Sequence, residues 1–169
     1  MKAKLIIEGK EIEVEISAEE YKKLQPSKEK KTGYERVEVG EEFYYVAASN
    51  KVEFGDDDYV PIDDKYYDIS NYYSSKEVAE NNARADKLMR QLRRFSVEHR
   101  ESEIDWYDIN SPKYYICYNY YENNFVVDYT YQNRLSGSIY FDSSELARAA
   151  IEEFHDELIW YFTEYQDSL

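Results

Sequence analysis

The sequence predicts an α+β fold made of two related β-β-β-α halves, preceded by an N-terminal β-hairpin and a short helix. Each half is expected to combine antiparallel strands with one long helix. Two kinds of apolar spacing support this prediction: alternation with period two, typical of strands, and helical spacing after a capping residue. Similar segments also recur at offsets of 71 and 68 residues, which indicates an internal repeat.

The first segment, KLIIEGKEIEVEIS, alternates apolar and polar residues on both sides of residues 8–10, which predicts a hairpin. Ser17 and Glu20 have the spacing of a capping box, so a short helix is expected to follow and to end before Pro26. We therefore assign residues 1–25 to a hairpin-helix module. The charged stretch PSKEKKTG, residues 26–33, is expected to be a linker.

The repeat divides the remaining chain into halves at 34–100 and 101–169. EFYYV in the first half matches KYYIC in the second, and NYYSSKEVAENNA matches IYFDSSELARAAI. Turns are expected at residues 50–51 and 122–124, which are rich in Asn. Chance alignment of Tyr-rich and Glu-rich segments is the alternative explanation.

One long helix is expected in each half. The first is predicted from about Ser75 to His99, opened by Ser74 with Glu77, and the second from Ser143 to about Tyr165, opened by Asp142 with Glu145. Their expected buried faces are Val78, Ala85, Leu88, Leu92 and Phe95 in the first helix, and Ala147, Ile151, Phe154, Leu158 and Phe162 in the second. The opposite face of the first helix is basic, with Arg84, Lys87, Arg90, Arg93 and Arg94.

The stretch KYYICYNYY, residues 113–121, contains five tyrosines. In a strand, Tyr114, Ile116, Tyr118 and Tyr120 share one face, and we expect that face to point toward the core. The other row stays available to a partner, since tyrosine is enriched at protein interfaces. The segment 103–112 between the halves is expected to cross the surface with Trp106 held in place.

The formal net charge of −15 is unevenly distributed. Residues 34–73 carry 3 basic against 11 acidic residues, and residues 104–169 carry 3 against 12. Such acidic blocks repel nucleic acid and attract basic surfaces, so direct DNA binding is not expected. The alternative without a binding function is that the acidic residues only keep an aromatic-rich surface soluble. With a single cysteine and no long apolar run, the chain is expected to be cytosolic.

The sequence lacks the motifs of the common catalytic and metal sites. It has no nucleophile elbow and no phosphate-binding loop, and His99, His155 and Cys117 lack zinc-site spacing. The aspartates at 56–58 and 63–64 lack the spacing of a calcium loop. We therefore expect no enzyme activity, cofactor or metal; a site assembled from carboxylates in three dimensions is the alternative.

Several segments resemble small proteins of phages and prophages of Gram-positive bacteria. They are KLIIEGKEIEVEISAEEYKKL, DISNYYSSKEVAENNARADKLMRQLRRF, EIDWYDINSPKYYICYNYY and SGSIYFDSSELARAAIEEFHDEL. Some proteins of this kind are found among anti-CRISPR candidates, which are small, often acidic inhibitors that bind CRISPR effector nucleases. The resemblance implies a mobile-element origin and action in the bacterial cytoplasm, and it transfers no functional residue.

These observations predict an inhibitor of a bacterial defence nuclease, such as a Cas effector, that occupies a basic nucleic-acid groove of its partner. The expected contacts are Asp56, Asp57, Asp58, Asp63, Asp64, Tyr59, Tyr66 and Tyr67 in the first half, and Glu152, Glu153, Asp156 and Glu157 in the second. The alternatives are a phage structural or scaffold component, and a nucleic-acid accessory protein that uses the basic face of the first long helix.

Overall fold

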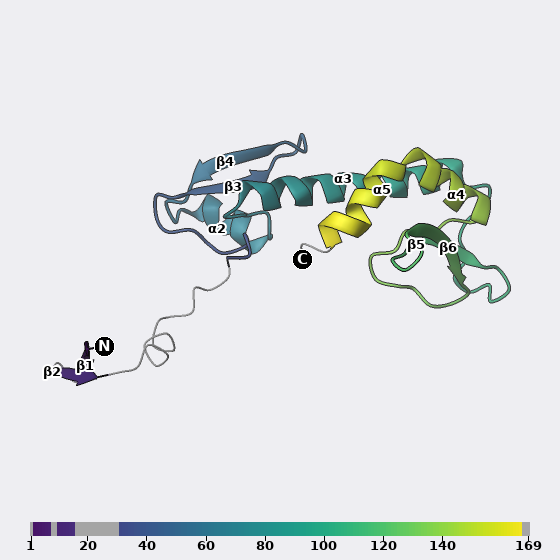
Figure 1. The fold of residues 1–169 in the computed structure, drawn as a ribbon. Coiled ribbons are helices and arrows are strands. Elements are labelled where there is room, and N and C mark those ends of the chain that lie inside the picture. Colours follow the sequence, from purple (N-terminus) through teal and green to yellow (C-terminus); the bar gives the residue numbers. More distant parts are fainter. Residues whose placement is uncertain (1, 8–9, 16–30, 167–169) are drawn as a thin grey trace.

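The computed structural model describes residues 2–7, 10–15 and 31–166, and their fold is α+β (Figure 1). The strands form three antiparallel pairs: β1 (Lys2–Ile7) with β2 (Lys10–Glu15), β3 (Glu42–Val46) with β4 (Val52–Asp56), and β5 (Lys113–Asn119) with β6 (Asn124–Thr130). The helices are α2 (Pro61–Asp68), α3 (Lys76–His99), α4 (Ser144–Glu153), α5 (His155–Trp160) and the π-helix η1 (Tyr161–Tyr165).

The predicted N-terminal hairpin is confirmed, with Lys2 opposite Glu15 and Ile7 opposite Lys10. The short helix expected after Ser17 and residues 26–30 of the expected linker lie outside the described residues.

Strands β5 and β6 pack on α4, and α3 contacts elements of both halves. Strands β3 and β4 contact it, as do α4 and η1 (Figure 1). Its cap is Ser75, whose Oγ accepts a hydrogen bond from Val78 N at 3.5 Å. Ser74, the predicted cap, instead joins the chain to the preceding segment, since its backbone N donates to Gly33 O at 2.8 Å.

No described helix, α3 included, combines the length and apolar content that a membrane span requires.

The buried side chains form two groups along α3. The group toward its C-terminal end is mainly aliphatic and comprises Leu88, Leu92, Phe141, Ala147, Ala150 and Leu158. Tyr114 and Ile116 of β5 pack against it, as predicted for their row, whereas Tyr120 of the same predicted row lies beyond the strand and is 53% exposed. The group at the other end is aromatic: Phe43 stacks on Tyr72 with ring centroids 4.3 Å apart.

The third strand predicted for each half is only a single pair of residues. Tyr44 forms an antiparallel bridge with Tyr73, and Tyr114 forms one with Phe141. A longer strand is prevented because helix caps follow two residues later, at Ser75 and at Ser143. The predicted hairpin turns are confirmed, since Asn50 and Asn123 adopt positive φ angles of 64° and 51°.

Two helices differ from the sequence prediction. The sequence analysis missed α2, although Pro61 lies at its first turn, where proline is favoured. The second long helix is broken at Phe154, whose φ and ψ of −113° and 22° are not helical. Ala147 and Ala150 before the break and Leu158 after it are all buried.

The C-terminal helices return along α3 toward the first half (Figure 1). Tyr165 donates its hydroxyl hydrogen to Asn82 Oδ1 at 3.0 Å, and Asn82 Nδ2 donates to the Tyr34 hydroxyl at 2.8 Å. Arg84 Nε lies 2.8 Å from Glu157 Oε2, and the Arg84 guanidinium covers the Trp160 ring at 3.9 Å. The middle of α3 thus links the beginning of the first half to the end of the second.

Gly33 offers a test of how the first half begins. It has φ +90°, and a Cβ there would lie 2.6 Å from Val78 Cγ2, whereas Gly40 has φ +81° with open space around it. We expect Gly33→Ala to lower the free energy of unfolding by about 2–5 kcal/mol, because steric overlap adds to the positive-φ cost of about 1–2 kcal/mol. Gly40→Ala should show only the smaller cost. Urea denaturation of both variants measures the difference, and equal losses would contradict this packing.

Candidate partner-binding surface

A buried ion pair organises the region that the sequence marks as the first acidic block. Arg36 Nε donates to Asp57 Oδ2 at 2.8 Å, and its Nη2 donates to Oδ1 at 3.1 Å. The carboxylate of Asp57 is completely buried and also accepts the Tyr72 hydroxyl at 2.7 Å and the Tyr59 backbone N–H at 2.9 Å. Four donors therefore compensate one buried charge.

These contacts fix the charge states of the group. Hydrogen bonding from Arg36 lowers the pKa of Asp57 to about 2, against the opposing effect of burial. Burial, and then the hydrogen bond to Asp57, raises the pKa of Tyr72 well above its usual range. At neutral pH the network is an ionised Asp57 bound by a cationic Arg36 and a protonated Tyr72.

Asp57 and Asp63 correct the sequence prediction, because both are buried and so do not lie on an accessible surface. Asp63 lies in the first turn of α2, and its Oδ2 accepts the backbone N–H of Asp58 at 3.0 Å and that of Val60 at 3.2 Å. Both carboxylates satisfy donors inside the protein, and this is why they are buried.

The other predicted residues of this block lie around α2 at the surface. Asp56 and Asp58 are exposed, and Asp64 is half exposed while its Oδ1 accepts from Arg36 Nη1 at 2.7 Å. Tyr59 is 48% exposed with its ring 4.0 Å from the Arg36 guanidinium, and Tyr67 is 42% exposed. Tyr66 is mostly covered because it stacks on Tyr45 with centroids 4.4 Å apart.

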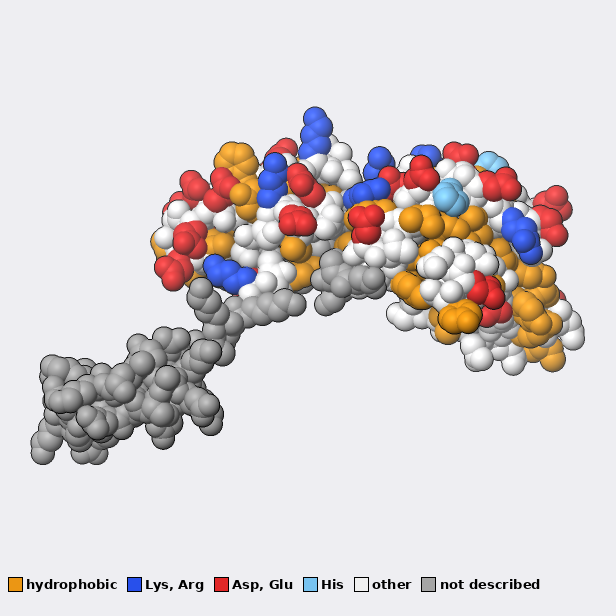
Figure 2. All heavy atoms as spheres, in the orientation of Figure 1, with side chains coloured by type: hydrophobic (Ala, Val, Ile, Leu, Met, Phe, Trp, Pro, Cys, Tyr) orange, Lys and Arg blue, Asp and Glu red, His pale blue; other side chains and the backbone are white. Residues whose placement is uncertain are grey.

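Sequence reasoning missed three exposed apolar residues here. Val60, Ile62 and Ile69 are 43%, 53% and 68% exposed. In the sequence these three residues stand beside acidic residues, which hints at a surface position. Their exposure could not be inferred, because α2 was not predicted. We define the α2 surface as the exposed residues Asp56, Asp58, Tyr59, Val60, Ile62, Asp64, Tyr67, Asp68 and Ile69. Figure 2 shows acidic and apolar side chains interspersed over the end of the molecule that carries β3, β4 and α2.

The backbone of this surface has an unusual conformation at Tyr59. Its φ is +54°, a region that bulky residues rarely adopt. The hydrogen bond from its N–H to Asp57 and the contact of its ring with Arg36 hold it there. The ion pair therefore sets the position of an exposed aromatic side chain.

The second predicted acidic patch is partly neutralised. Glu152, Glu153 and Asp156 are exposed, but Glu157 pairs with Arg84. A hollow of about 530 Å³ between α3 and the C-terminal helices is lined by acidic residues together with Arg84 and Lys87. Opposite charges side by side weaken the field of this patch, as Arg36 and the exposed Lys65 do at the α2 surface.

The basic face of α3 is largely engaged in internal contacts. Arg84 pairs with Glu157, Arg94 Nε lies 3.7 Å from Glu98 Oε2, and Arg90 donates to Asn50 Oδ1. Within the described residues, Lys87 and Arg93 have no carboxylate within 4.0 Å.

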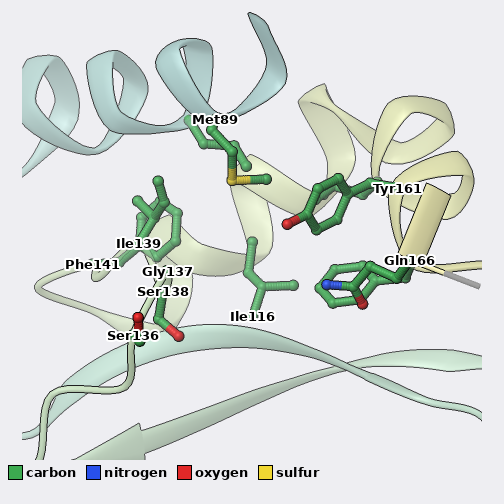
Figure 3. A pocket seen from close by; sticks show the side chains of 12 residues that line it. Met89, Ile116, Ser136, Gly137, Ser138, Ile139, Phe141, Tyr161 and Gln166 are labelled. Carbon is green, nitrogen blue, oxygen red and sulfur yellow. The ribbon is translucent and has the colours of Figure 1, made fainter. Parts of the chain in front are cut away.

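A small apolar cavity lies between α3, β5 and the C-terminal helices (Figure 3). Its volume is about 170 Å³, below the roughly 300–1,000 Å³ of typical ligand sites. Met89, Ile116 and Tyr161 surround it, with Ser138 and Gln166 at its polar side. We interpret it as a packing void beside η1.

Metal ligands do not converge anywhere in the part of the chain that is described: no three or more His, Cys, Asp or Glu side chains are placed to hold an ion. His155 Nδ1 lies 3.1 Å from its neighbour Asp156 Oδ1, and both side chains are exposed.

Replacing Asp57 tests the buried network. We expect Asp57→Asn to lower the free energy of unfolding by about 2–4 kcal/mol, because Arg36 and Tyr72 lose a charged acceptor. The matched control Asp58→Asn lies on the exposed side and should leave the stability nearly unchanged. Thermal and urea unfolding compare the two variants, and similar stabilities would mean that the network contributes little.

The pH dependence of stability follows from the same group. Because the folded pKa of Asp57 is lowered to about 2, its ionised form stabilises the fold above the unfolded pKa of about 4. We expect the stability advantage of the wild type over Asp57→Asn to be complete above about pH 4 and to shrink as the pH falls toward 2. Urea titrations at several pH values measure this difference. A constant difference across that window would show that Asp57 is not the titrating group.

Comparison of the chain with protein-family models, with curated proteins and with solved structures gives no match in any of the three.

Proposed function

We propose that this protein inhibits a bacterial defence nuclease by binding, without turnover of its own, and that the α2 surface makes the contact. The observation that carries the proposal is the combination of exposed carboxylates and exposed apolar side chains on a support fixed by the Arg36–Asp57 ion pair. Carboxylates on a rigid scaffold can take the place of phosphates in a basic nucleic-acid groove. Occupying that groove would exclude the DNA or guide RNA of the partner.

Rigidity matters because an ordered surface loses less conformational entropy on binding than a mobile one. Asp57 and Asp63 hold the segment that contains Asp58 and Tyr59 through hydrogen bonds to its backbone. The two buried aspartates thus support the proposal indirectly, by positioning their exposed neighbours.

Charge and apolar area have separate roles in this proposal. The net charge of −15 speeds the encounter with a basic partner. Apolar contact area comes from the exposed side chains of Tyr59, Ile62, Tyr67 and Ile69. Burial of this area in the interface excludes water and lengthens the lifetime of the complex. The resemblance to phage and prophage proteins supports a Cas effector as the partner and the bacterial cytoplasm as the place of action.

The two alternatives remain distinguishable. A phage structural or scaffold component would copurify with capsid or tail proteins. A nucleic-acid accessory protein would use the basic face of α3, but Arg84, Arg90 and Arg94 of that face already have partners. We therefore favour the inhibitor.

The experiment begins with the full-length protein as bait in a bacterial lysate that contains defence nucleases. Cleavage of target DNA by the captured, purified nuclease is then measured with Asp58→Lys/Asp68→Lys and with Glu152→Lys/Glu153→Lys. Both variants reverse two exposed carboxylates and change the net charge equally. We expect the first to weaken inhibition at least tenfold, through slower association and lost contacts, and the second to act nearly as the wild type.

Equal inhibition by the wild type and both variants would rule out the acidic contact. Equal weakening by both would mean that net charge, rather than the α2 surface, governs binding. Failure to capture or inhibit any nuclease would remove the inhibitor proposal.

We also infer that the two halves derive from one repeated unit. The support is that Tyr44 and Tyr73 in the first half, and Tyr114 and Phe141 in the second, each form a bridge between a hairpin and the residues before a Ser-capped helix. The helix α2 in the first half and the break at Phe154 in the second are differences that a common origin must accommodate.

A further inference from the structure

A hollow at the C-terminal end of α3 carries three arginines in an otherwise acidic protein. Its volume is about 620 Å³, within the range of typical small-molecule sites. Arg93 and Arg100 come from α3 and its C-cap, and Arg134 from the segment after β6. We propose that this hollow binds a mononucleotide, with the arginines on its phosphate and an apolar floor under its base.

The arginines are available to a ligand. Across residues 31–166, no carboxylate lies within 4.0 Å of the basic nitrogens of Arg93, Arg100 or Arg134. Arg93 and Arg100 are seven residues apart and so share one face of the helix. The negative C-terminal end of the helix dipole favours a positively charged residue at position 100. The dipole does not explain why Arg134, from a different segment, lies at the same hollow.

Trp106 orients one of the three arginines, Arg134. The Arg134 guanidinium lies 4.3 Å from the centroid of the indole ring. A guanidinium stacked on a ring keeps its N–H donors in its own plane, where they can form paired hydrogen bonds to a phosphate. Trp106 is itself held edge-on by Tyr140, with centroids 4.8 Å apart.

Hydrogen bonds fix the frame of the hollow before any ligand binds. Buried Ser96 donates its hydroxyl hydrogen to Tyr140 O at 2.6 Å, and Leu135 N donates to the Tyr140 hydroxyl at 2.6 Å. Asp142 Oδ2 accepts the backbone N–H groups of Glu101 and Ser102 at 2.7 and 3.0 Å, which holds the chain after α3. The segments that carry the arginines are therefore preorganised.

The apolar part of the hollow argues for a base as well as a phosphate. Val97 and Leu135 line it and are 58% and 46% exposed. A planar base would cover this area, whereas inorganic phosphate would leave it in water. The exposed Glu101, Glu103 and Asp105 lie in the loop that lines the hollow, so each further phosphate of a polyanion that extends past the arginines would add repulsion.

The test is isothermal titration of the full chain with AMP, GMP, CMP and UMP, and with adenosine and inorganic phosphate as the separate parts. We expect at least one mononucleotide to bind at least tenfold more tightly than either part. Arg93→Gln/Arg134→Gln should weaken that binding at least tenfold. The control Lys87→Gln/Arg94→Gln removes the same amount of charge at two α3 positions outside the hollow and should change the binding less than twofold.

Circular dichroism checks that both variants are folded, which is expected because the substituted side chains are exposed. Absence of binding by all four mononucleotides at millimolar concentration would overturn the proposal. So would unchanged binding by the Arg93/Arg134 variant, or equal affinity for inorganic phosphate and the mononucleotide. Tighter binding of a single-stranded oligonucleotide would overturn the restriction to a single nucleotide. The inference does not depend on the inhibitor proposal.

Discussion

The packing of two small hairpins against helices, β3–β4 on α3 and β5–β6 on α4, is the constraint on which the fold of residues 31–166 depends. An isolated two-stranded hairpin is at best marginally stable in water, and neither β3–β4 nor β5–β6 gains a third strand longer than one pair. Each hairpin must therefore bury its inner face against helical elements. Helix α3 serves both ends, with an aromatic group at Phe43 and Tyr72 and an aliphatic group at Leu88 and Leu92.

The acidic composition has two physical roles. Asp57 and Asp63 are buried and satisfy donors from Arg36 and from the backbone around Tyr59, so their charge stabilises local structure. Asp58 and Asp68 are exposed and contribute to the field outside the protein. A count of carboxylates in the sequence cannot separate these roles, because they depend on which donors the fold brings near.

Elements with strong local signals were predictable. The period-two row of Tyr114 and Ile116 packs on the core, and the boundaries of α3 follow from its serine cap and apolar spacing. The break at Phe154 and the burial of Asp57 depend on contacts between segments that are distant in the sequence. A single sequence contains no local pattern that predicts such contacts. The same holds for the meeting of Arg134 with Trp106. Helix α2 was not predicted, because its aspartates were interpreted as part of an acidic block and the proline at its first turn was overlooked.

The contacts of Tyr165 bear on cooperativity. Through Asn82, this residue near the C-terminal end is joined to Tyr34 at the start of the first half, across sequence separations of 83 and 48 residues. Separation of the C-terminal helices from the first half would break these hydrogen bonds, so the contact couples the two halves. Contacts so distant along the chain close long loops, and the entropic cost of that closure makes the folding of the chain slower than local contacts alone would allow.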